Sequence, residues 1–256
     1  MVKPLLSVMM PAIRPKNWLG LYNSIVQSLG SLDFEIIFVT PHAHLPPELE
    51  GAKNIKLVKD YGSPTRCFGI AMLLAEGEYI TWSADDATYV PGQLAKVIET
   101  HKSLNNDNLV IAMEQTEATR HYSADSCRIN ADPGIACNVP DSFHFFPTAL
   151  MKRQLYEKFG GLNCDYQTHA MAHLDFAIRA QKGGVDVLFY KEIVLHLTHM
   201  MGRTGDHGPI CDVQTFEDQP LFLARHRDPN YKQDLKIDPF AWQNEAIVWT
   251  KRFKLS

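Results

Sequence analysis

Residues 77–91, GEYITWSADDATYVP, carry the features from which the fold can be worked out. Residues 78–83 alternate in polarity and are rich in aromatic and β-branched side chains, which predicts a strand. Two carboxylates, Asp85 and Asp86, follow directly, and Pro91 with Gly92 favours the start of a helix. Open α/β sheets bind ligands at the carboxyl ends of strands, and carboxylates suit Mg²⁺ or Mn²⁺. The alternative is that both aspartates only solvate a turn.

Apolar strands and amphipathic helices alternate on both sides of this stretch. Strands are predicted at residues 5–10, 34–40 and 55–59, and helices at residues 17–30, 63–76 and 92–104. Such alternation over about 100 residues is typical of βαβ units, which form a mostly parallel sheet with right-handed crossovers. We therefore expect an α/β fold with helices on both faces of the sheet.

The second half of the sequence is less regular, so a mixed architecture is expected there. Strands are predicted at residues 109–114, 142–147, 185–190 and 194–199, and helices from residue 148 to 160, from 170 to 182, and around residues 242–249. Residues 115–141 form a long polar connection, which in a compact domain is usually functional or mobile. We expect one domain over residues 1–215, with halves at 1–108 and 109–215, and a helical extension over 216–256.

The composition excludes several classes of protein. The chain has 256 residues, of which 45% are hydrophobic, and a net charge of -4, which argues against a surface built chiefly for nucleic acid. No apolar run approaches membrane-spanning length and no leader is evident, so no membrane span is expected. The five cysteines form no CxxC pair, which fits a reducing compartment. These features predict a soluble, cytoplasmic protein.

Several segments together resemble the family 2 glycosyltransferases of the GT-A fold, a Rossmann-like architecture. The similarity covers residues 5–199 and rests on motifs that occur in the family's order. These are LLSVMMPAIRP, FEIIFVTPH, SPTRCFGIAMLLAEGEYITW, the ADD sequence at residues 84–86, FFPTALMKRQLYEKFGGLN and AHLDFAIRAQKGG. The resemblance implies a nucleotide-binding first half and an acceptor-binding second half.

The resemblance also implies a divalent cation, Mn²⁺ or Mg²⁺, although one carboxylate of the family's motif is missing. Aligned without gaps, the family's two metal-motif aspartates fall on Ala84 and Asp86, with Asp85 between them. Asp86 is the first candidate for the metal, and Asp85 the neighbour that reaches the ribose or a metal-bound water. The family often supplies a further ligand near His196, with His199 as the competitor. The alternative for His196 is a hydrogen-bonded residue of the core.

Two residues compete for the role of general base. The family's Glu-Asp pair falls on Ala172 and His173, so His173 occupies the position of the base and Asp175 is the later acidic residue. On a helix these two side chains diverge by about 200°, so they cannot both face one site. His173, with an ordinary histidine pKa near 6.5, would give an acid limb at about pH 6–7. Asp175 has an alternative role, since Arg179 stands at ion-pair spacing four residues on.

The remaining candidates concern the donor nucleotide. The resemblance and the loop positions together suggest these nucleotide-sugar ligands: Pro11, Ala12, Arg14, His42, Arg66, Asp85 and Arg203. Arg66 has an alternative role as an exposed arginine at a helix start. Arg203 lies in a glycine-rich loop, residues 202–209, whose composition is typical of a lid.

The function implied by the resemblance is that of an inverting, metal-dependent hexosyl- or pentosyltransferase. It would move a sugar from a nucleoside diphosphate to a hydroxyl of a glycan, a lipid-linked sugar, a protein or a modified nucleic acid. Ala84 and the absent Glu-Asp pair leave an alternative, a non-catalytic sugar- or nucleotide-binding module. A dinucleotide enzyme is disfavoured, because the first strand-to-helix turn, PAIRPKN, lacks a glycine-rich phosphate fingerprint.

Overall fold

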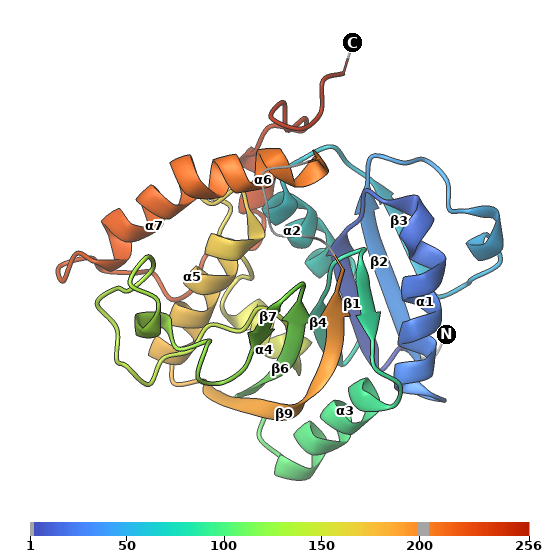
Figure 1. The fold of residues 1–256 in the computed structure, drawn as a ribbon, viewed down its shortest axis with the longest axis horizontal. Coiled ribbons are helices and arrows are strands. Elements are labelled where there is room, and N and C mark those ends of the chain that lie inside the picture. Colours follow the sequence, from blue (N-terminus) through green and yellow to red (C-terminus); the bar gives the residue numbers. More distant parts are fainter. Residues whose placement is uncertain (1–2, 199–204, 256) are drawn as a thin grey trace.

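The computed structural model describes residues 3–198 and 205–255. In this part of the chain one sheet of nine strands is covered by helices on both faces (Figure 1). The first half alternates strands and helices as the sequence predicts, and the expected α/β class is confirmed. No helix of the described residues is long and apolar enough to cross a membrane.

The strands lie in the order β3-β2-β1-β4-β8-β6-β9-β5, and β7 pairs with β6 beside this path. Their bounds are Leu6–Pro11 (β1), Phe34–Thr40 (β2), Ile55–Lys59 (β3), Tyr79–Trp82 (β4), Ala87–Tyr89 (β5), Leu109–Glu117 (β6), Arg120–Tyr122 (β7), Ala149–Lys152 (β8) and Asp186–Leu197 (β9). The strands β3, β2, β1 and β4 are mutually parallel, whereas β8 is antiparallel to β4 and β6. The carboxyl ends of β1, β2 and β4 therefore meet at one edge of the sheet.

The helices form two layers, one on each face. Helices α1 (Pro15–Leu29) and α3 (Gln93–Leu104) pack on one face, and α2 (Pro64–Leu74), α4 (Arg153–Lys158) and α5 (His169–Lys182) pack on the other. Strands β1 and β2 contribute side chains to both layers, which explains why their sequences are mostly apolar rather than alternating.

Local signals set the ends of these elements. Helix α1 begins with Pro15 and ends at Gly30, whose φ of 63° favours glycine. Helix α2 begins after Ser63, whose hydroxyl accepts a hydrogen bond from the amide of Arg66. Strands β2 and β3 have the predicted bounds; β2, FEIIFVT, is mostly apolar, β3, IKLVK, alternates apolar residues with lysines, and a turn residue follows each of them.

Several predictions for the second half are wrong. The helix expected from residue 148 to 160 is shorter, because Ala149–Lys152 form strand β8 and α4 covers only Arg153–Lys158. Residues 142–147 form no strand; Phe146 is buried, but the ladder begins at Ala149. The two strands expected after α5 are one long strand, β9, which pairs with both β6 and β5. The polar connection after residue 114 extends β6 to Glu117, and a turn with Ala118 at a φ of 49° leads into β7.

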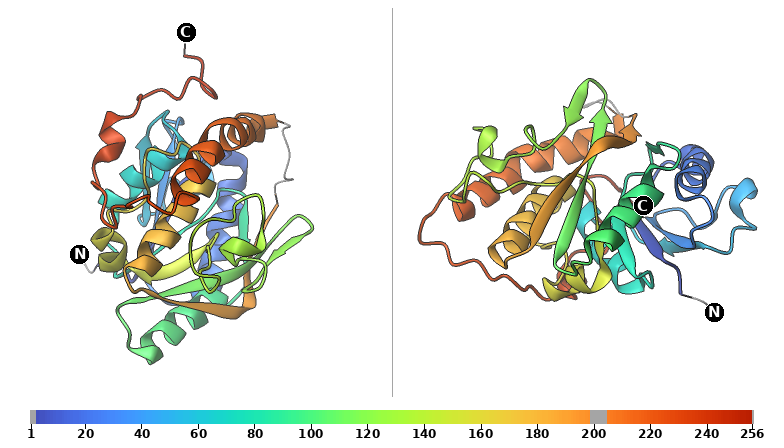
Figure 2. Two further views of the ribbon diagram at one scale, coloured as in Figure 1. Left: turned by 90° about the vertical axis from the view of Figure 1, so that its left-hand side faces the viewer. Right: turned by 90° about the horizontal axis from the view of Figure 1, so that it is seen from below.

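The C-terminal part is helical only at its beginning. Helix α6 (Gly208–Val213), the π-helical turn Gln214–Asp218 and α7 (Gln219–His226) form a continuous run, which crosses the boundary predicted between residues 215 and 216. The closing helix expected around residues 242–249 is wrong, because only the 3-10 turn Ala241–Asn244 forms there. Figure 2 shows the segment after α7 running back across the molecule.

Candidate functional site

A half-open cavity of about 280 Å³ lies at the carboxyl ends of β1 and β4. Arg14, Asp85 and Asp86 form a charged part of its wall, and Trp82 and Phe68 an apolar part. Segments that are distant in the sequence complete the wall. Among the residues that they contribute are His169, His173, His207, Ile210 and Arg252. The stretch that follows β4 therefore lies at the centre of the site, as the sequence predicts.

Asp85 holds the loop between β1 and α1 in place. Its Oδ2 accepts hydrogen bonds from the backbone amides of Ile13 and Arg14, at 2.7 and 2.6 Å, and its Oδ1 accepts one from Arg14 Nη1 at 2.5 Å. Both oxygens of this buried carboxylate are thus occupied by protein donors. Hydrogen bonds to a charged group contribute about 1.5–3 kcal/mol each, so Asp85 shapes the site through this loop.

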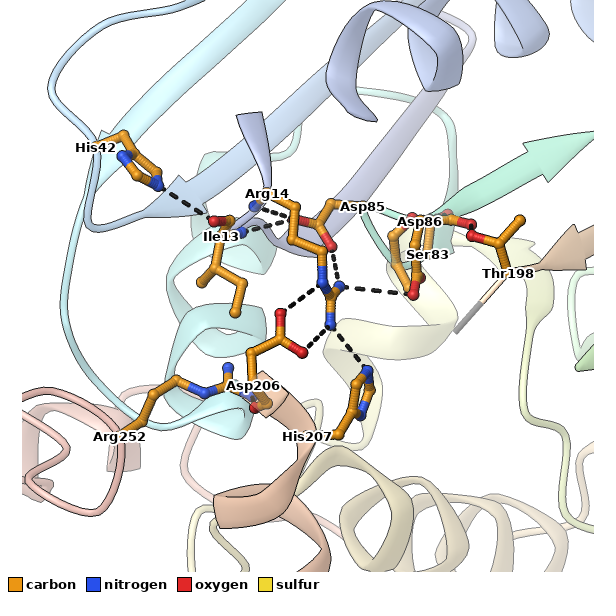
Figure 3. A network of polar contacts seen from close by, with 11 residues as sticks. Ile13, Arg14, His42, Ser83, Asp85, Asp86, Thr198, Asp206, His207 and Arg252 are labelled. Carbon is orange, nitrogen blue, oxygen red and sulfur yellow. Dashed lines mark hydrogen bonds and ion pairs between the residues drawn. The ribbon is translucent and has the colours of Figure 1, made fainter. Parts of the chain in front are cut away.

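Arg14 lines the cavity and links the segment after β4 to residues 206 and 207 (Figure 3). Its Nη1 lies 3.6 Å from Asp86 Oδ2, its Nε donates to Asp206 Oδ2 at 2.7 Å, and its Nη2 lies 2.8 Å from His207 Nε2. Burial disfavours the charged guanidinium, but the hydrogen bond and the attraction of three carboxylates outweigh it and raise the pKa of Arg14. Arg14 is therefore a permanent positive charge in the wall of the cavity.

Asp86 is the second buried carboxylate beside Arg14, and it lies farther from the guanidinium than Asp85 does. Its backbone carbonyl accepts hydrogen bonds from the amide and hydroxyl of Thr198, at 3.3 and 3.1 Å, which join the end of β9 to the loop after β4. Of the predicted metal ligands in the described residues, Asp86 is the one in the cavity wall.

The other predicted metal ligands are not brought to the cavity by the described part of the chain. His196 is exposed, and its Nδ1 lies 2.6 Å from the hydroxyl of Thr116. Its neighbour Leu197 lines the cavity, and successive side chains of a strand point to opposite faces, so His196 points away. His199 and Arg203 lie outside the described residues. Within residues 3–198 and 205–255 no group of three metal-ligating side chains is found.

His173 enters the cavity wall from α5. Its side chain is buried and stacks on Trp82, with ring centroids 4.5 Å apart, and its Nε2 has no hydrogen-bond partner among the described residues. Burial, aided by the neighbouring His169, lowers the pKa of His173 well below 6.5. The imidazole is therefore neutral at physiological pH, with a nitrogen available to a ligand in the cavity.

Asp175 faces the opposite side of α5 and does not line the cavity. Its Oδ2 accepts from Arg179 Nε at 2.7 Å, and its Oδ1 from His226 Nε2 and Gln233 Nε2. Burial alone would raise the pKa of Asp175, but the hydrogen bonds from His226 and Arg179 outweigh it and hold this pKa below 3.8. The position corrects the expectation that Asp175 competes for the role of base, because it is the anchor of a buried ion pair.

The predicted nucleotide ligands divide into two groups. Pro11 and Arg14 line the cavity, whereas Ala12 is fully buried and His42 Nε2 lies 3.2 Å from the carbonyl of Ile13, behind the loop. Arg66 also lies outside the lining; it is buried, pairs with Asp60 at 3.0 Å and donates to the carbonyl of Trp242. Its expected contact with nucleotide is therefore replaced by a contact with the C-terminal segment.

Comparison of the sequence with protein-family models and with curated proteins finds no match. Among solved structures, residues 1–349 of TarS from S. aureus in complex with UDP share 14% identity, with a TM-score of 0.56 over 76% of this chain and 60% of that chain. The complex with UDP-GlcNAc shares 15% identity, with a TM-score of 0.54 over 77% and 59%. This chain thus spans less than two thirds of these TarS chains.

The chain has the GT-A fold. The resemblance noted in the sequence motifs is confirmed at the level of architecture, and the charged cluster lies at the strand ends where such sheets bind ligands. A likeness at this identity concerns the fold and does not by itself assign a substrate.

Two residues of this GT-A site, Asp206 and His207, belong to the loop at residues 202–209 that the sequence predicts as a lid, whereas the sequence predicts no role for Arg252. Asp206 and His207 contact Arg14, and Arg252 donates to the backbone carbonyl of Asp206 at 2.6 Å. The sequence signal for Arg252 is only that of a short cationic stretch, Lys251 to Lys254. Nothing local in that stretch indicates that it returns to the end of β1.

Proposed function

We propose that this protein is an inverting glycosyltransferase, which moves a sugar from a nucleoside diphosphate donor to an acceptor hydroxyl. The observation that supports this most directly is a shared cavity, in which the charged group of Arg14, Asp85 and Asp86 and the neutral, buried His173 line one wall. The GT-A fold, which TarS shows in complexes with UDP and UDP-GlcNAc, adds support for a nucleotide-sugar donor.

In this proposal His173 acts as the general base. Its unpartnered Nε2 takes the proton of the acceptor hydroxyl as the hydroxyl oxygen attacks the anomeric carbon. The bond from that carbon to the β-phosphate oxygen breaks, and its electron pair leaves on the nucleoside diphosphate. Attack from the side opposite the leaving group inverts the anomeric centre. Arg14 offers positive charge to the departing diphosphate, and the apolar wall around Trp82 limits the access of water.

The charges of the site favour a divalent cation, which the proposal includes. In the network around Arg14, two guanidiniums, Arg14 and Arg252, stand against three carboxylates, Asp85, Asp86 and Asp206. The cavity lining adds one more guanidinium, Arg120, and two more carboxylates, Glu117 and Asp132. A nucleoside diphosphate adds further negative charge, so a bound Mn²⁺ or Mg²⁺ would neutralise the leaving group. Asp86 is the carboxylate that fits this role, because both oxygens of Asp85 are already occupied by donors.

Binding and turnover together test the function. UDP, GDP, ADP, CDP and dTDP are compared by thermal shift with and without Mn²⁺, because a ligand of the native state raises Tm by mass action. Hydrolysis of the matching nucleotide sugars is then followed by release of the diphosphate. Stabilisation with slow hydrolysis is the expected result. Stabilisation without hydrolysis or transfer would favour the non-catalytic binding module, and no stabilisation by any of the five would exclude the proposal.

The two aspartates are expected to behave differently when replaced. Asp86→Asn should remove most of the gain in affinity that Mn²⁺ gives, while binding without the cation remains. Asp85→Asn should instead weaken binding in both conditions and destabilise the protein by about 1–3 kcal/mol, because it loses charge-assisted bonds to two backbone amides and to Arg14.

Calorimetric titration of the best diphosphate with and without Mn²⁺ measures both effects of the aspartate substitutions. An Asp86→Asn protein with the full Mn²⁺ effect would contradict the metal assignment. Equal Mn²⁺ effects in both variants would contradict the division of roles.

A further inference from the structure

The residues at 242–253, here named the C-terminal strap, are fastened across the start of α2 and onto α6. Trp242 lies against Arg66, and Ser63 donates to Glu245 Oε2 at 2.7 Å. Further along, the Trp249 amide donates to the carbonyl of Tyr61 at 2.8 Å, and its buried ring packs with Ile210 and Val213 of α6. These contacts fix the position of the residue three places after Trp249, which is Arg252.

Arg252 reaches the cavity from the strap, as Figure 3 shows. Its Nη2 donates to the backbone carbonyl of Asp206 at 2.6 Å, and its buried Nε has no hydrogen-bond partner among the described residues. Burial lowers the pKa of Arg252, and the nearby charge of Arg14 acts in the same direction against the attraction of Asp206. Arg14 and Arg252 thus both contact Asp206, and among the described residues no acceptor takes the Nε–H of Arg252.

Asp206 is the anion that lies between these guanidiniums. Its carboxylate accepts from Arg14 Nε at 2.7 Å and from Arg14 Nη2 at 3.2 Å, the paired arrangement in which arginine also binds phosphates. The Asp206 side chain is 43% exposed, so water can replace the protein around it when it leaves Arg14. By contrast, the carboxylate of Asp85 on the other edge of Arg14 is buried and held by two backbone amides.

We propose that Arg14 and Arg252 form a clamp for the diphosphate of the donor, and that Asp206 occupies this clamp when no donor is bound. The inference rests on the proposed function and adds to it a residue from the C-terminal strap and an internal competitor. The diphosphate takes the Arg14 donors that Asp206 releases and the free Nε of Arg252. A ligand must bring enough negative charge to displace Asp206, so the site selects diphosphates over nucleosides.

Two substitutions of opposite expected effect test the clamp. Arg252→Gln should weaken binding of the best nucleoside diphosphate about 10-fold or more, since it removes a charged donor, while Asp206→Asn should strengthen binding several-fold. The corresponding nucleoside, which lacks the diphosphate, should bind all variants alike. The matched control is Lys254→Gln, which makes the same charge change at an exposed position directly after the strap and should bind like the parent.

The measurement is calorimetric titration of each variant with the diphosphate, the nucleoside and inorganic pyrophosphate. Arg252→Lys keeps the charge and the aliphatic stem, so it serves if Arg252→Gln does not fold, and it should weaken binding less. The role of Arg252 would be overturned if its variants bind the diphosphate like the parent. It would also be overturned if they lose no more affinity than Lys254→Gln does. Unchanged or weaker binding by Asp206→Asn would overturn the competition.

Inorganic pyrophosphate separates failure of the clamp from failure of the proposed function. If the parent binds none of the five nucleoside diphosphates, the proposed function is overturned. The anion clamp is still supported in that case if the parent binds pyrophosphate and Arg252→Gln does not. If the parent binds neither the diphosphates nor pyrophosphate, both are overturned. If it binds a diphosphate and Arg252→Gln binds equally well, only the clamp is overturned.

Discussion

Replacement of His173 by glutamine is expected to lower turnover by about 10²–10⁴-fold, the usual contribution of a general base, while the affinity for nucleoside diphosphate stays close to that of the parent. His173 is 5% exposed and stacks on Trp82, and its Nε2 has no hydrogen-bond partner in the part of the chain that the structure describes. The loss should therefore appear in kcat. The control is His169→Gln, one turn earlier in α5 and also in the cavity wall, which should cost much less.

The pH profile gives an independent check on His173. Its neutral form is the base, and burial lowers its pKa well below 6.5, so the rate should fall only when the pH drops below that lowered value. A bound donor brings negative charge and raises the pKa again. The acid limb of kcat/KM, which reports the free enzyme, should thus lie at lower pH than the limb of kcat. A larger loss in His169→Gln than in His173→Gln would transfer the role of base to His169.

Replacement of Asp175 by asparagine is expected to destabilise the protein by about 3–5 kcal/mol, because it leaves the buried guanidinium of Arg179 without its counter-charge. Turnover per folded molecule should remain within a few-fold of the parent, since Asp175 lies outside the cavity lining. Urea unfolding measures the first quantity and initial rates the second. The control is Asp165→Asn, whose 56% exposed side chain pairs with Arg225 and should cost about 1 kcal/mol or less.

The acid dependence of stability should also change in Asp175→Asn. The pKa of Asp175 is held below 3.8 in the folded protein, so its ionised form stabilises the fold above that value. This contribution is lost as the pH falls through the lowered pKa, and the asparagine variant should lack that part of the acid transition. A stable Asp175→Asn protein with a 10²-fold loss of turnover would return Asp175 to the list of candidate bases.

The sequence predicts those parts of the molecule in which local signals and neighbouring segments agree. Strand β2 is a mostly apolar segment and β3 alternates apolar residues with lysines, and both lie between turn residues. Asp85 and Asp86 follow a strand whose end must lie at the ligand edge of a parallel sheet. The angular separation of His173 and Asp175 on one helix is also predictable, although the sequence does not say which of them faces the cavity.

The incorrect or missing predictions concern contacts between distant segments. Arg66 looks like an exposed arginine at a helix start, but the strap covers it from 176 residues away. The apolar residues 242–249 suggest an amphipathic helix, yet Trp242 and Trp249 each pack on a different distant segment, and only the 3-10 turn Ala241–Asn244 is helical between them. No periodicity in the sequence encodes which surface these side chains will cover.

The strap also determines when the site becomes complete during synthesis. Ser63 and its partner Glu245 are separated by 182 residues, which at about 5–20 residues per second are made over roughly 10–40 s. Throughout that interval the first strands and α2 can fold on the ribosome, but the start of α2 lacks its cover and the cavity lacks Arg252. The nascent chain therefore cannot complete the proposed anion-binding wall until the strap has emerged, after nearly all of this sequence has been translated.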